Sequence, residues 1–269
     1  MMSDLYWYPK FDGKSMIFFR FGGPGLGNLL FPFSRALIGA EKTKGIFIEP
    51  IWMQLKIGPM LRRERDLRTY VGEFSREYAV DGKVSNFTKF SKCKKIKEDE
   101  YNNEITEGCI VVGGLRNYFD DLCGYRKLIR AEIDKRISVR KYKSSAELQG
   151  CIAMHVRLGD FGSVDANKLK AGGSNTRINL DWYAGVVHKM KSIYGKDVCF
   201  NLYSDGRDEE LESLLRISGV NRRHAGSTIN DLMEMGNHGA LIASASTYSM
   251  WGGISGKCSD NLLSGANGI

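Results

Sequence analysis

Residues 15–40 read SMIFFRFGGPGLGNLLFPFSRALIGA, and this stretch decides the fold class of the chain. The apolar run 15–21 predicts a buried β-strand, the glycine-rich segment after it predicts a tight turn, and apolar residues of 29–40 recur at helical spacing. Residues 45–50 (GIFIEP) predict a second strand, which Pro50 ends. Strand, turn, helix and strand in this order are typical of a βαβ unit with parallel strands.

The second half of the chain alternates in the same way, after a linker predicted at 141–150. Alternating strands and helices favour a doubly wound parallel sheet, so we predict an α/β protein. Residues 62–107 are polar and basic and predict loops with short helices. The further predicted strands are 109–112, 151–157, 198–203 and 239–243, and the predicted helices are 120–139, 180–194, 208–217, 228–235 and one that opens within 244–252.

Composition narrows the class of protein. With 269 residues, 42% of them hydrophobic and 26% charged, the chain is an ordinary globular protein rather than a disordered or fibrous one. At about 150 residues per domain, this length suggests two domains. No apolar run is long enough for a membrane span, and residues 1–14 lack the pattern of a signal peptide. The net charge of +8 leaves three partners open: nucleic acid, an anionic membrane surface, or a small ligand that carries phosphate.

The six cysteines are widely spaced, and none forms a C-x-x-C pair, which excludes zinc-finger and thioredoxin-like sites. Cys151 and Cys199 lie in apolar runs and are predicted to be buried thiols. Free thiols persist in a reducing compartment, so we expect a cytoplasmic protein.

The glycine turn is neither of the two familiar nucleotide-binding motifs. Gly25 and Gly27 are not followed by the third glycine of G-x-G-x-x-G, and the G-K-[ST] of a P-loop is absent. What remains is a helix N-terminus at Asn28, where backbone N–H groups can face an anion or a sugar oxygen. A tight turn that only lets strand and helix pack explains the same residues.

A second motif, HVRLGD at 155–160, follows a predicted buried strand. Ligands of parallel α/β sheets bind at the carboxyl ends of strands, and Arg157 there presents a planar fork of donors that suits a diphosphate. Asp160 would orient Arg157 or His155. The structural alternative is an ion pair of Arg157 with Asp160 and a core position for His155.

Two further motifs also follow predicted strands. Ser204 and Asp205 suit a ribose or a base, although the same residues commonly cap a helix. Ser246, Thr247 and Ser249 stand at a predicted helix N-terminus, where hydroxyl and backbone donors suit a phosphate, and where a plain helix cap is the alternative. The sequence has no D-x-D, H-E-x-x-H or His/Cys cluster that would indicate a metal site.

In this order, the motifs resemble those of the α1,2-fucosyltransferase family and of the wider α1,2/α1,6/O-fucosyltransferase superfamily. That family carries a glycine loop close to G-G-L-G-N, then H-x-R-x-G-D, S-D, D-x-x-x-M and an S-x-F-S-W-W-G-like segment. Here the chain departs from the pattern with Met250 in place of the first tryptophan and Leu158 in place of a frequent second arginine. The matching stretches are 23–28, 155–160, 204–205, 231–235 and 246–252.

The resemblance implies a two-domain, GT-B-type glycosyltransferase whose Rossmann-like domains face a cleft, with residues 1–143 on the acceptor side and 144–269 on the donor side. It implies an inverting, metal-independent enzyme without a cofactor, which transfers fucose from GDP-fucose to a glycan hydroxyl. Two alternatives stay open: another nucleotide-sugar donor, or a basic module that binds nucleic acid or an anionic surface.

The resemblance also assigns residue roles. Arg157 would grip the β-phosphate and assist its departure, His155 would lie near the donor, and Asp160 is a candidate general base. The remaining donor contacts would come from the nucleoside side at Ser204 and Asp205, from the diphosphate side at Ser246, Thr247 and Ser249, and from the loop that carries Gly25, Gly27 and Asn28.

Overall fold

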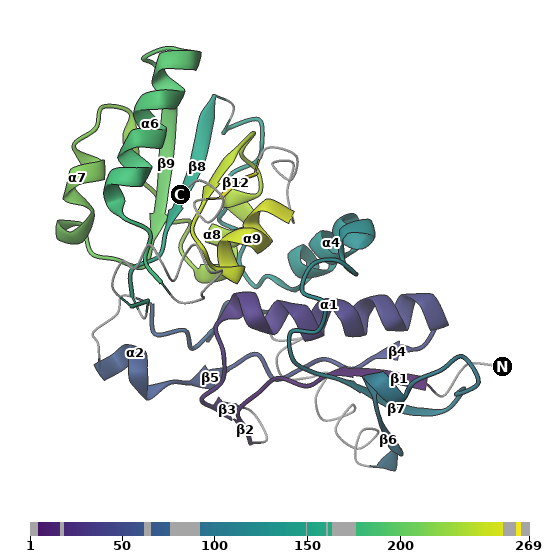
Figure 1. Ribbon diagram of the computed structural model, residues 1–269. Helices are drawn as coiled ribbons and strands as arrows, with labels where there is room; N and C mark the ends of the chain where they lie inside the picture. The colour runs from purple at the N-terminus through teal and green to yellow at the C-terminus, as the bar shows by residue number, and fades with distance from the viewer. Residues whose placement is uncertain are drawn as a thin grey trace. The chain divides into compact units, whose positions relative to one another are not determined.

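The computed structural model describes residues 5–16, 19–61, 66–75, 92–148, 150–159, 161–162, 176–254 and 262–264. The chain divides into two compact units (Figure 1), and both are of mixed α/β architecture with parallel strands. Unit 1 comprises Met1–Gly58 and Arg68–Arg140, and unit 2 comprises Pro59–Leu67 and Lys141–Ile269. The α/β class predicted from the sequence is confirmed, whereas the assignment of acceptor and donor sides stays a prediction.

Unit 1 is built on a four-stranded parallel sheet. The long helix α1 (Leu26–Thr43) runs along one face of this sheet (Figure 1), and its residues Ala36 and Ala40 pack against Leu5 and Trp7. The helix therefore supplies the apolar layer that a parallel sheet needs on its face. The strand order is β4 (Ile46–Phe47), β1 (Leu5–Pro9), β7 (Gly108–Val112) and β6 (Lys95–Lys97).

The strand that precedes α1 in this βαβ unit is β1, and the strand predicted at 15–21 is wrong. Instead, β2 (Lys14–Ser15) and β3 (Arg20–Phe21) form an antiparallel pair, and β3 adds β5 (Gln54–Leu55) to make a small second sheet. Burial explains the difference, because Phe21 is 47% exposed whereas Leu5 is 2% exposed. The core is filled by the alternating side chains of β1, whereas Phe21 lies outside that core, and residues 17 and 18 of the predicted strand lie outside the described residues.

The rest of unit 1 differs from the sequence prediction in two segments. Inside the basic segment 62–107, which was predicted as loops and short helices, β6 pairs in parallel with β7. The helix predicted at 120–139 is shorter, because η3 (Cys123–Tyr125) precedes α4 (Arg126–Arg136). The buried guanidinium of Arg136 anchors α4 by pairing with Glu49 and Glu132. The short η2 (Glu98–Glu100) also belongs to unit 1, while the short helix α2 (Ile57–Leu61) spans the point where the chain passes from unit 1 to unit 2.

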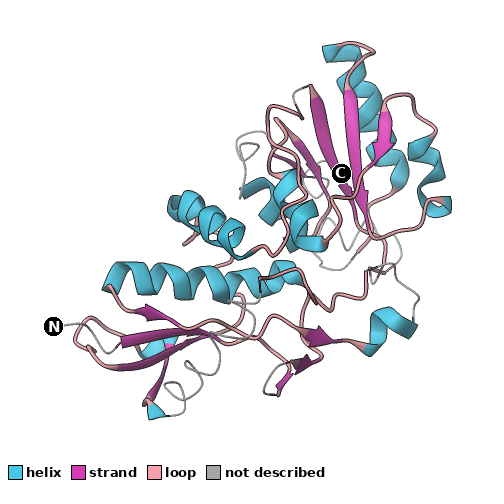
Figure 2. Cartoon of the chain, turned by 180° about the vertical axis from the view of Figure 1, so that it is seen from behind, coloured by secondary structure: helices cyan, strands magenta, loops and turns pink. Residues whose placement is uncertain are grey.

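Unit 2 is a five-stranded parallel sheet with helices on both faces (Figure 2), as predicted for a doubly wound arrangement. The strand order is β10 (Val220–Arg222), β9 (Cys199–Ser204), β8 (Cys151–Val156), β11 (Leu241–Ala243) and β12 (Leu262–Ser264). Its helices are α6 (Leu180–Tyr194), η4 (Glu209–Leu211), α7 (Glu212–Leu215), α8 (Thr228–Met235) and α9 (Thr247–Ile254).

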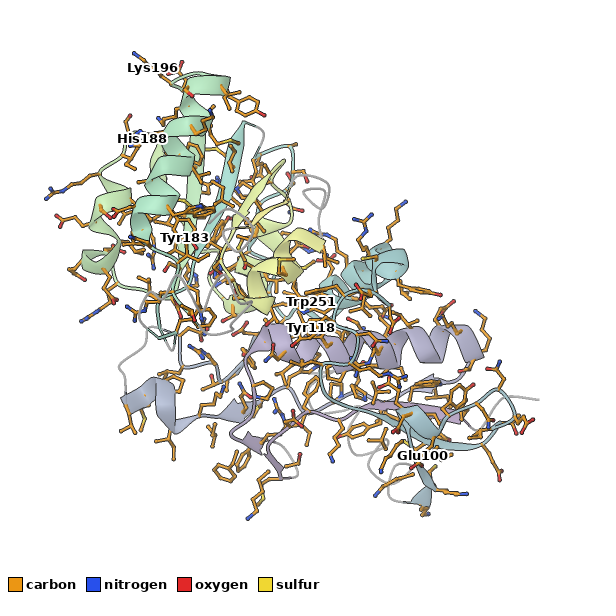
Figure 3. All side chains as sticks on the ribbon, in the orientation of Figure 1. Glu100, Tyr118, Tyr183, His188, Lys196 and Trp251 are labelled. Atoms are coloured by element: carbon orange, nitrogen blue, oxygen red, sulfur yellow. A yellow bond between two sulfur atoms is a disulfide. The ribbon has the colours of Figure 1, made fainter. Side chains whose placement is uncertain are left out.

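The central strand β8 contributes side chains to two separate apolar cores, one on each face of the sheet. Met154 and its alternate neighbours along the strand pack with α6 and α7, while Ala153 packs on the opposite face with Met235 of α8. On α6, Tyr183 is buried in the first of these cores, and His188 is exposed on the same helix (Figure 3). A strand buried on both faces reads as an unbroken apolar run, which is why the sequence predicts β8 well.

Most of the predicted elements of unit 2 are confirmed, and helices 180–194 and 228–235 match α6 and α8. The single helix predicted at 208–217 is wrong, because the segment is η4 followed by the one-turn helix α7. Strand β10 was not predicted, since Val220 is its only apolar residue and gives no alternation.

A disulfide joins β8 to β9, so the prediction that Cys151 and Cys199 are thiols is wrong. The two residues face each other in the register of the parallel pair and are bonded through their sulfur atoms. Their separation of 48 residues hides this contact from the sequence. The inference of a reducing compartment from these two cysteines therefore no longer holds.

Among the residues that the structure describes, no helix is long and apolar enough to cross a membrane.

We expect the disulfide to stabilise unit 2. Closing a loop of 48 residues restricts the unfolded chain by about 4 kcal/mol on a chain-entropy estimate. Thermal unfolding of the Cys151→Ser/Cys199→Ser variant should therefore occur at a lower temperature than that of the wild type. The exposed Cys123 provides the control, since Cys123→Ser should leave the transition unchanged. Labelling of Cys151 and Cys199 by a thiol reagent in the folded, unreduced protein would contradict the assignment.

Candidate functional site

Three neighbouring strands of unit 2 bring the predicted residues to one edge of its sheet. Strand β8 lies between β9 and β11, and all three run parallel. Their carboxyl ends therefore share an edge, where Arg157 follows β8, Asp205 follows β9 and Ser244 follows β11. This edge is where ligands of parallel α/β sheets bind.

Arg157 is held in place by Asp205. Because Val156 is in register with Ser204, the residues that follow these two stand side by side, and the Arg157 Nη1 atom lies 2.9 Å from the Asp205 Oδ2 atom. The Oδ1 atom of Asp205 accepts a hydrogen bond of 2.8 Å from the Leu158 N–H. Asp160, which the sequence offered as the partner of Arg157, lies outside the described residues. The arginine side chain is 17% exposed, so its fork is fixed and still reaches solvent.

The loop after β9 is pressed against the loop after β8. The Ser204 hydroxyl accepts a hydrogen bond of 3.0 Å from the Gly206 N–H, so it closes a turn rather than capping the predicted helix. A Cβ atom on Gly206 would lie 2.5 Å from a methyl group of Leu158. A side chain at 206 would therefore displace Leu158, so the two loops are closely packed against each other.

The start of α9 holds a cluster of three serine hydroxyls. The Oγ atom of Ser244 lies 2.9 Å from that of Ser246 and 3.1 Å from that of Ser249, and the latter two are 3.0 Å apart. Ser246 also accepts a hydrogen bond from the Ser249 N–H, which is the geometry of an N-cap. Thr247 is the first residue of α9, whose first turn holds no acidic residue. The positive end of this helix dipole therefore stands at the sheet edge uncompensated.

His155 supports this cluster from inside the protein. Its side chain is buried, its Nδ1 atom lies 2.8 Å from the Ser244 Oγ atom, and its ring packs against Tyr248. Burial, followed in size by the opposing effects of Asp205 and Arg157, lowers the pKa of His155 far below its usual value. The imidazole is therefore neutral at physiological pH. The predicted placement of His155 near a donor stays a prediction.

Sequence reasoning missed a buried carboxylate beneath the site. Glu234 accepts hydrogen bonds of 2.7 Å from the Tyr203 hydroxyl, 2.7 Å from the Lys143 N–H and 3.0 Å from Arg223. Burial alone raises the pKa of Glu234, but these hydrogen bonds outweigh it and the pKa is lowered. The charged group ties the segment after residue 140 to β9 and α8. Its neighbour Asp231, one of the motif residues, pairs with His224.

The predicted glycine-turn residues belong to unit 1. Gly25 is the N-cap of α1, without a side-chain cap, and Gly27 and Asn28 lie in its first turn. A cavity of about 70 Å³ borders this turn. It is lined by Lys10, Phe11, Asp12, Pro24, Asn28, Leu29, Pro32, Gly114 and Leu115. The turn thus offers a helix N-terminus without a side-chain cap beside a small cavity of mixed polar and apolar lining.

Comparison with known proteins supports the architecture. No family model and no curated protein matches the chain. The crystal structure of POFUT1 in complex with GDP-fucose is 12% identical in sequence and matches with a TM-score of 0.50 over 97% of this chain and 96% of that one. The chain shares the fold of POFUT1. NodZ alpha-1,6-fucosyltransferase soaked with GDP-fucose aligns at 13% identity and a TM-score of 0.45, over 94% of this chain and 92% of its own.

The neutral His155 predicts a pH dependence of stability. The pKa of His155 is lowered in the folded state from its usual value of 6.5. Below pH 6.5, His155 is therefore protonated in the unfolded chain but stays neutral in the folded chain. Stability should fall as the pH drops, by about 2 kcal/mol from this residue at pH 5. Urea unfolding of His155→Asn should show a shallower loss than the wild type between about pH 7 and pH 5.

The control for this measurement is His188→Asn, which changes an exposed histidine on α6. It should reproduce the wild-type pH profile. Parallel profiles for His155→Asn and the wild type would show that His155 is not held neutral in the folded state.

Proposed function

We propose that this protein is a fucosyltransferase-type glycosyltransferase, which transfers L-fucose from GDP-fucose to a hydroxyl group of a glycan acceptor. The observation that carries the proposal is the meeting of Arg157, Asp205 and the N-terminus of α9 at one edge of a parallel sheet. The fold is shared with POFUT1, whose crystal structure contains GDP-fucose. The order of the sequence motifs supports the same assignment.

The chemistry of the edge suits a diphosphate. A guanidinium fork binds phosphate oxygens through two parallel N–H groups, and a helix N-terminus adds backbone donors and a favourable dipole. Arg157 is already oriented by Asp205, so little reorganisation is needed when an anion arrives. Donors fixed in advance stabilise developing charge more effectively than donors that must first be ordered.

In the proposed reaction, the acceptor oxygen attacks C1 of fucose from the side opposite to GDP, and the bond between C1 and the β-phosphate oxygen breaks. The electron pair of that bond leaves on the diphosphate, where Arg157 and the start of α9 stabilise it. The configuration at C1 is inverted, and no step requires a metal ion. The acceptor proton needs a base, for which Asp160 remains our candidate.

The other residues act around this centre. We assign Asp205 to the orientation of Arg157, with Ser204 shaping the turn beside the nucleoside, and His155 to the orientation of Ser244. Ser246, Thr247 and Ser249 present the helix start to the diphosphate. Unit 1 would serve the acceptor, and the residues of its glycine turn, Gly25, Gly27 and Asn28, would contact the donor.

Binding of the donor should be specific for its nucleotide. A ligand of the folded state raises the unfolding free energy by about 2.7 kcal/mol at a concentration of 100 times its Kd. GDP and GDP-fucose should therefore raise the melting temperature, while UDP- and dTDP-sugars at equal concentration should not. A larger shift with a UDP- or dTDP-sugar would reassign the donor, and no shift with any nucleotide would refute the proposed function.

Arg157 should be essential for transfer. Removal of a charged group that stabilises the transition state costs about 10²–10³-fold in rate, so Arg157→Ala should lose at least this factor in kcat/KM for GDP-fucose. Arg216→Ala removes an exposed arginine at the end of α7 and should keep full activity. Full activity of a folded Arg157→Ala variant would exclude the assigned role.

A further inference from the structure

Arg20, on β3 of unit 1, is a buried cation that forms no ion pair with a carboxylate of the described residues. Its side chain is almost wholly inaccessible, with 1% of the residue exposed. The guanidinium donates to the Ile51 carbonyl at 2.8 Å, to the Asp12 carbonyl at 2.7 Å and to the Gln54 side-chain oxygen at 3.1 Å. All three acceptors are neutral groups. Burial lowers the pKa of Arg20 to about 10, so the group keeps its positive charge at neutral pH.

Two other buried arginines of unit 1 show the usual arrangement. Arg35 pairs with Glu98, and Arg136 pairs with Glu49 and Glu132. A buried charge is costly unless an opposite charge compensates it, and these two sites follow that rule. Within the described residues, Arg20 has no such partner within ion-pair distance. The Asp12 carboxylate attracts the charge of Arg20 without pairing with it, so the charge is only partly compensated and can attract an anion from outside the chain.

This partly compensated charge lies directly under the glycine turn. A Cβ atom on Gly23 would come within 2.8 Å of the Arg20 Nη1 atom and within 2.5 Å of the Asp12 carbonyl oxygen. Gly23 has a φ of +110°, a conformation that favours glycine. The turn is therefore packed onto the guanidinium with no side chain between them.

Gln54 completes the connection between Arg20 and the start of α1. Its amide nitrogen donates to the Pro24 carbonyl at 3.3 Å and to the Arg68 carbonyl at 2.8 Å, while its oxygen accepts from Arg20. Pro24 precedes the N-cap Gly25, so the hydrogen bonds run from Arg20 through Gln54 to the helix start. A glutamate at 54 would be nearly the same shape and would neutralise Arg20, although it could not donate the two hydrogen bonds of the Gln54 amide nitrogen.

The same place already favours an anion for two other reasons. The helix α1 has 18 residues, and its first turn holds no acidic residue to compensate the helix dipole. The cavity beside the turn is lined by Lys10 and Asn28, with Asp12 as the opposing charge. A fixed buried cation adds to this potential and costs no ordering when the ligand binds.

We infer that Arg20, with Gln54, is a positioning residue that shapes the glycine turn and keeps it electropositive for the diphosphate of the nucleotide-sugar donor. This inference rests on the proposed function, because it takes the donor to be the anion that the turn meets. It predicts a role in donor affinity for two residues that are shut off from solvent.

The test compares charge with shape at these two positions. Affinity for GDP would be measured by calorimetry, KM and kcat for GDP-fucose by kinetics, and folding by thermal melting. Arg20→Met and Gln54→Glu should each weaken GDP binding about tenfold and raise KM more than they lower kcat. Arg20→Lys keeps the charge and should recover most of the affinity. Arg136→Met, which removes an equally buried arginine that has carboxylate partners, should lower the melting temperature but leave GDP affinity unchanged.

The outcomes separate this inference from the proposed function. Wild-type affinity for GDP in folded Arg20→Met and Gln54→Glu variants would overturn the inference, with the donor site of unit 2 intact. If Arg20→Met does not fold, Gln54→Glu decides, because it keeps the Arg20 side chain and changes the charge beside it. Equal weakening in Arg136→Met would likewise overturn it in favour of a purely structural role. Absence of GDP binding to the wild type would instead refute the proposed function, and the inference with it.

Discussion

The parallel pairing of β8 with β9 on one side and β11 on the other is the constraint on which unit 2 depends. Its register sets Val156 beside Ser204, and hence places the Arg157 guanidinium against the Asp205 carboxylate. The same register places Cys151 opposite Cys199 at the other end of the strands, where the disulfide fixes the register. A slip of the register would separate both pairs, because each depends on residues far apart in the chain.

The sequence predicts unit 2 better than unit 1, for physical reasons. Strand β8 is buried on both faces and gives an unbroken apolar run, and α6 shows clear helical periodicity. In unit 1, Phe21 of the strong apolar run at 15–21 is exposed, and the small second sheet that contains β3 depends on Gln54, far along the chain. Patterning reports how apolar a segment is, whereas tertiary packing decides which segment fills the core.

The candidate site shows the same limit. The position of Arg157 after a buried strand was predictable, because ligands gather where parallel strands end. Its partner was not, since Asp205 comes from the neighbouring strand and only the register reveals it. The buried hydrogen bonds of His155 with Ser244 and of Glu234 with Tyr203 were hidden in the same way. Residue types indicate the chemistry of a site, while strand pairing decides which residues share it.

The central claim is that the edge formed by Arg157 and the start of α9 binds a nucleoside diphosphate. A crystal structure of the protein with GDP tests it most directly. The account predicts that oxygens of the β-phosphate lie about 2.7–2.9 Å from the Arg157 guanidinium, beside the first turn of α9. A diphosphate bound away from this edge, with Arg157 still paired only to Asp205, would contradict the account.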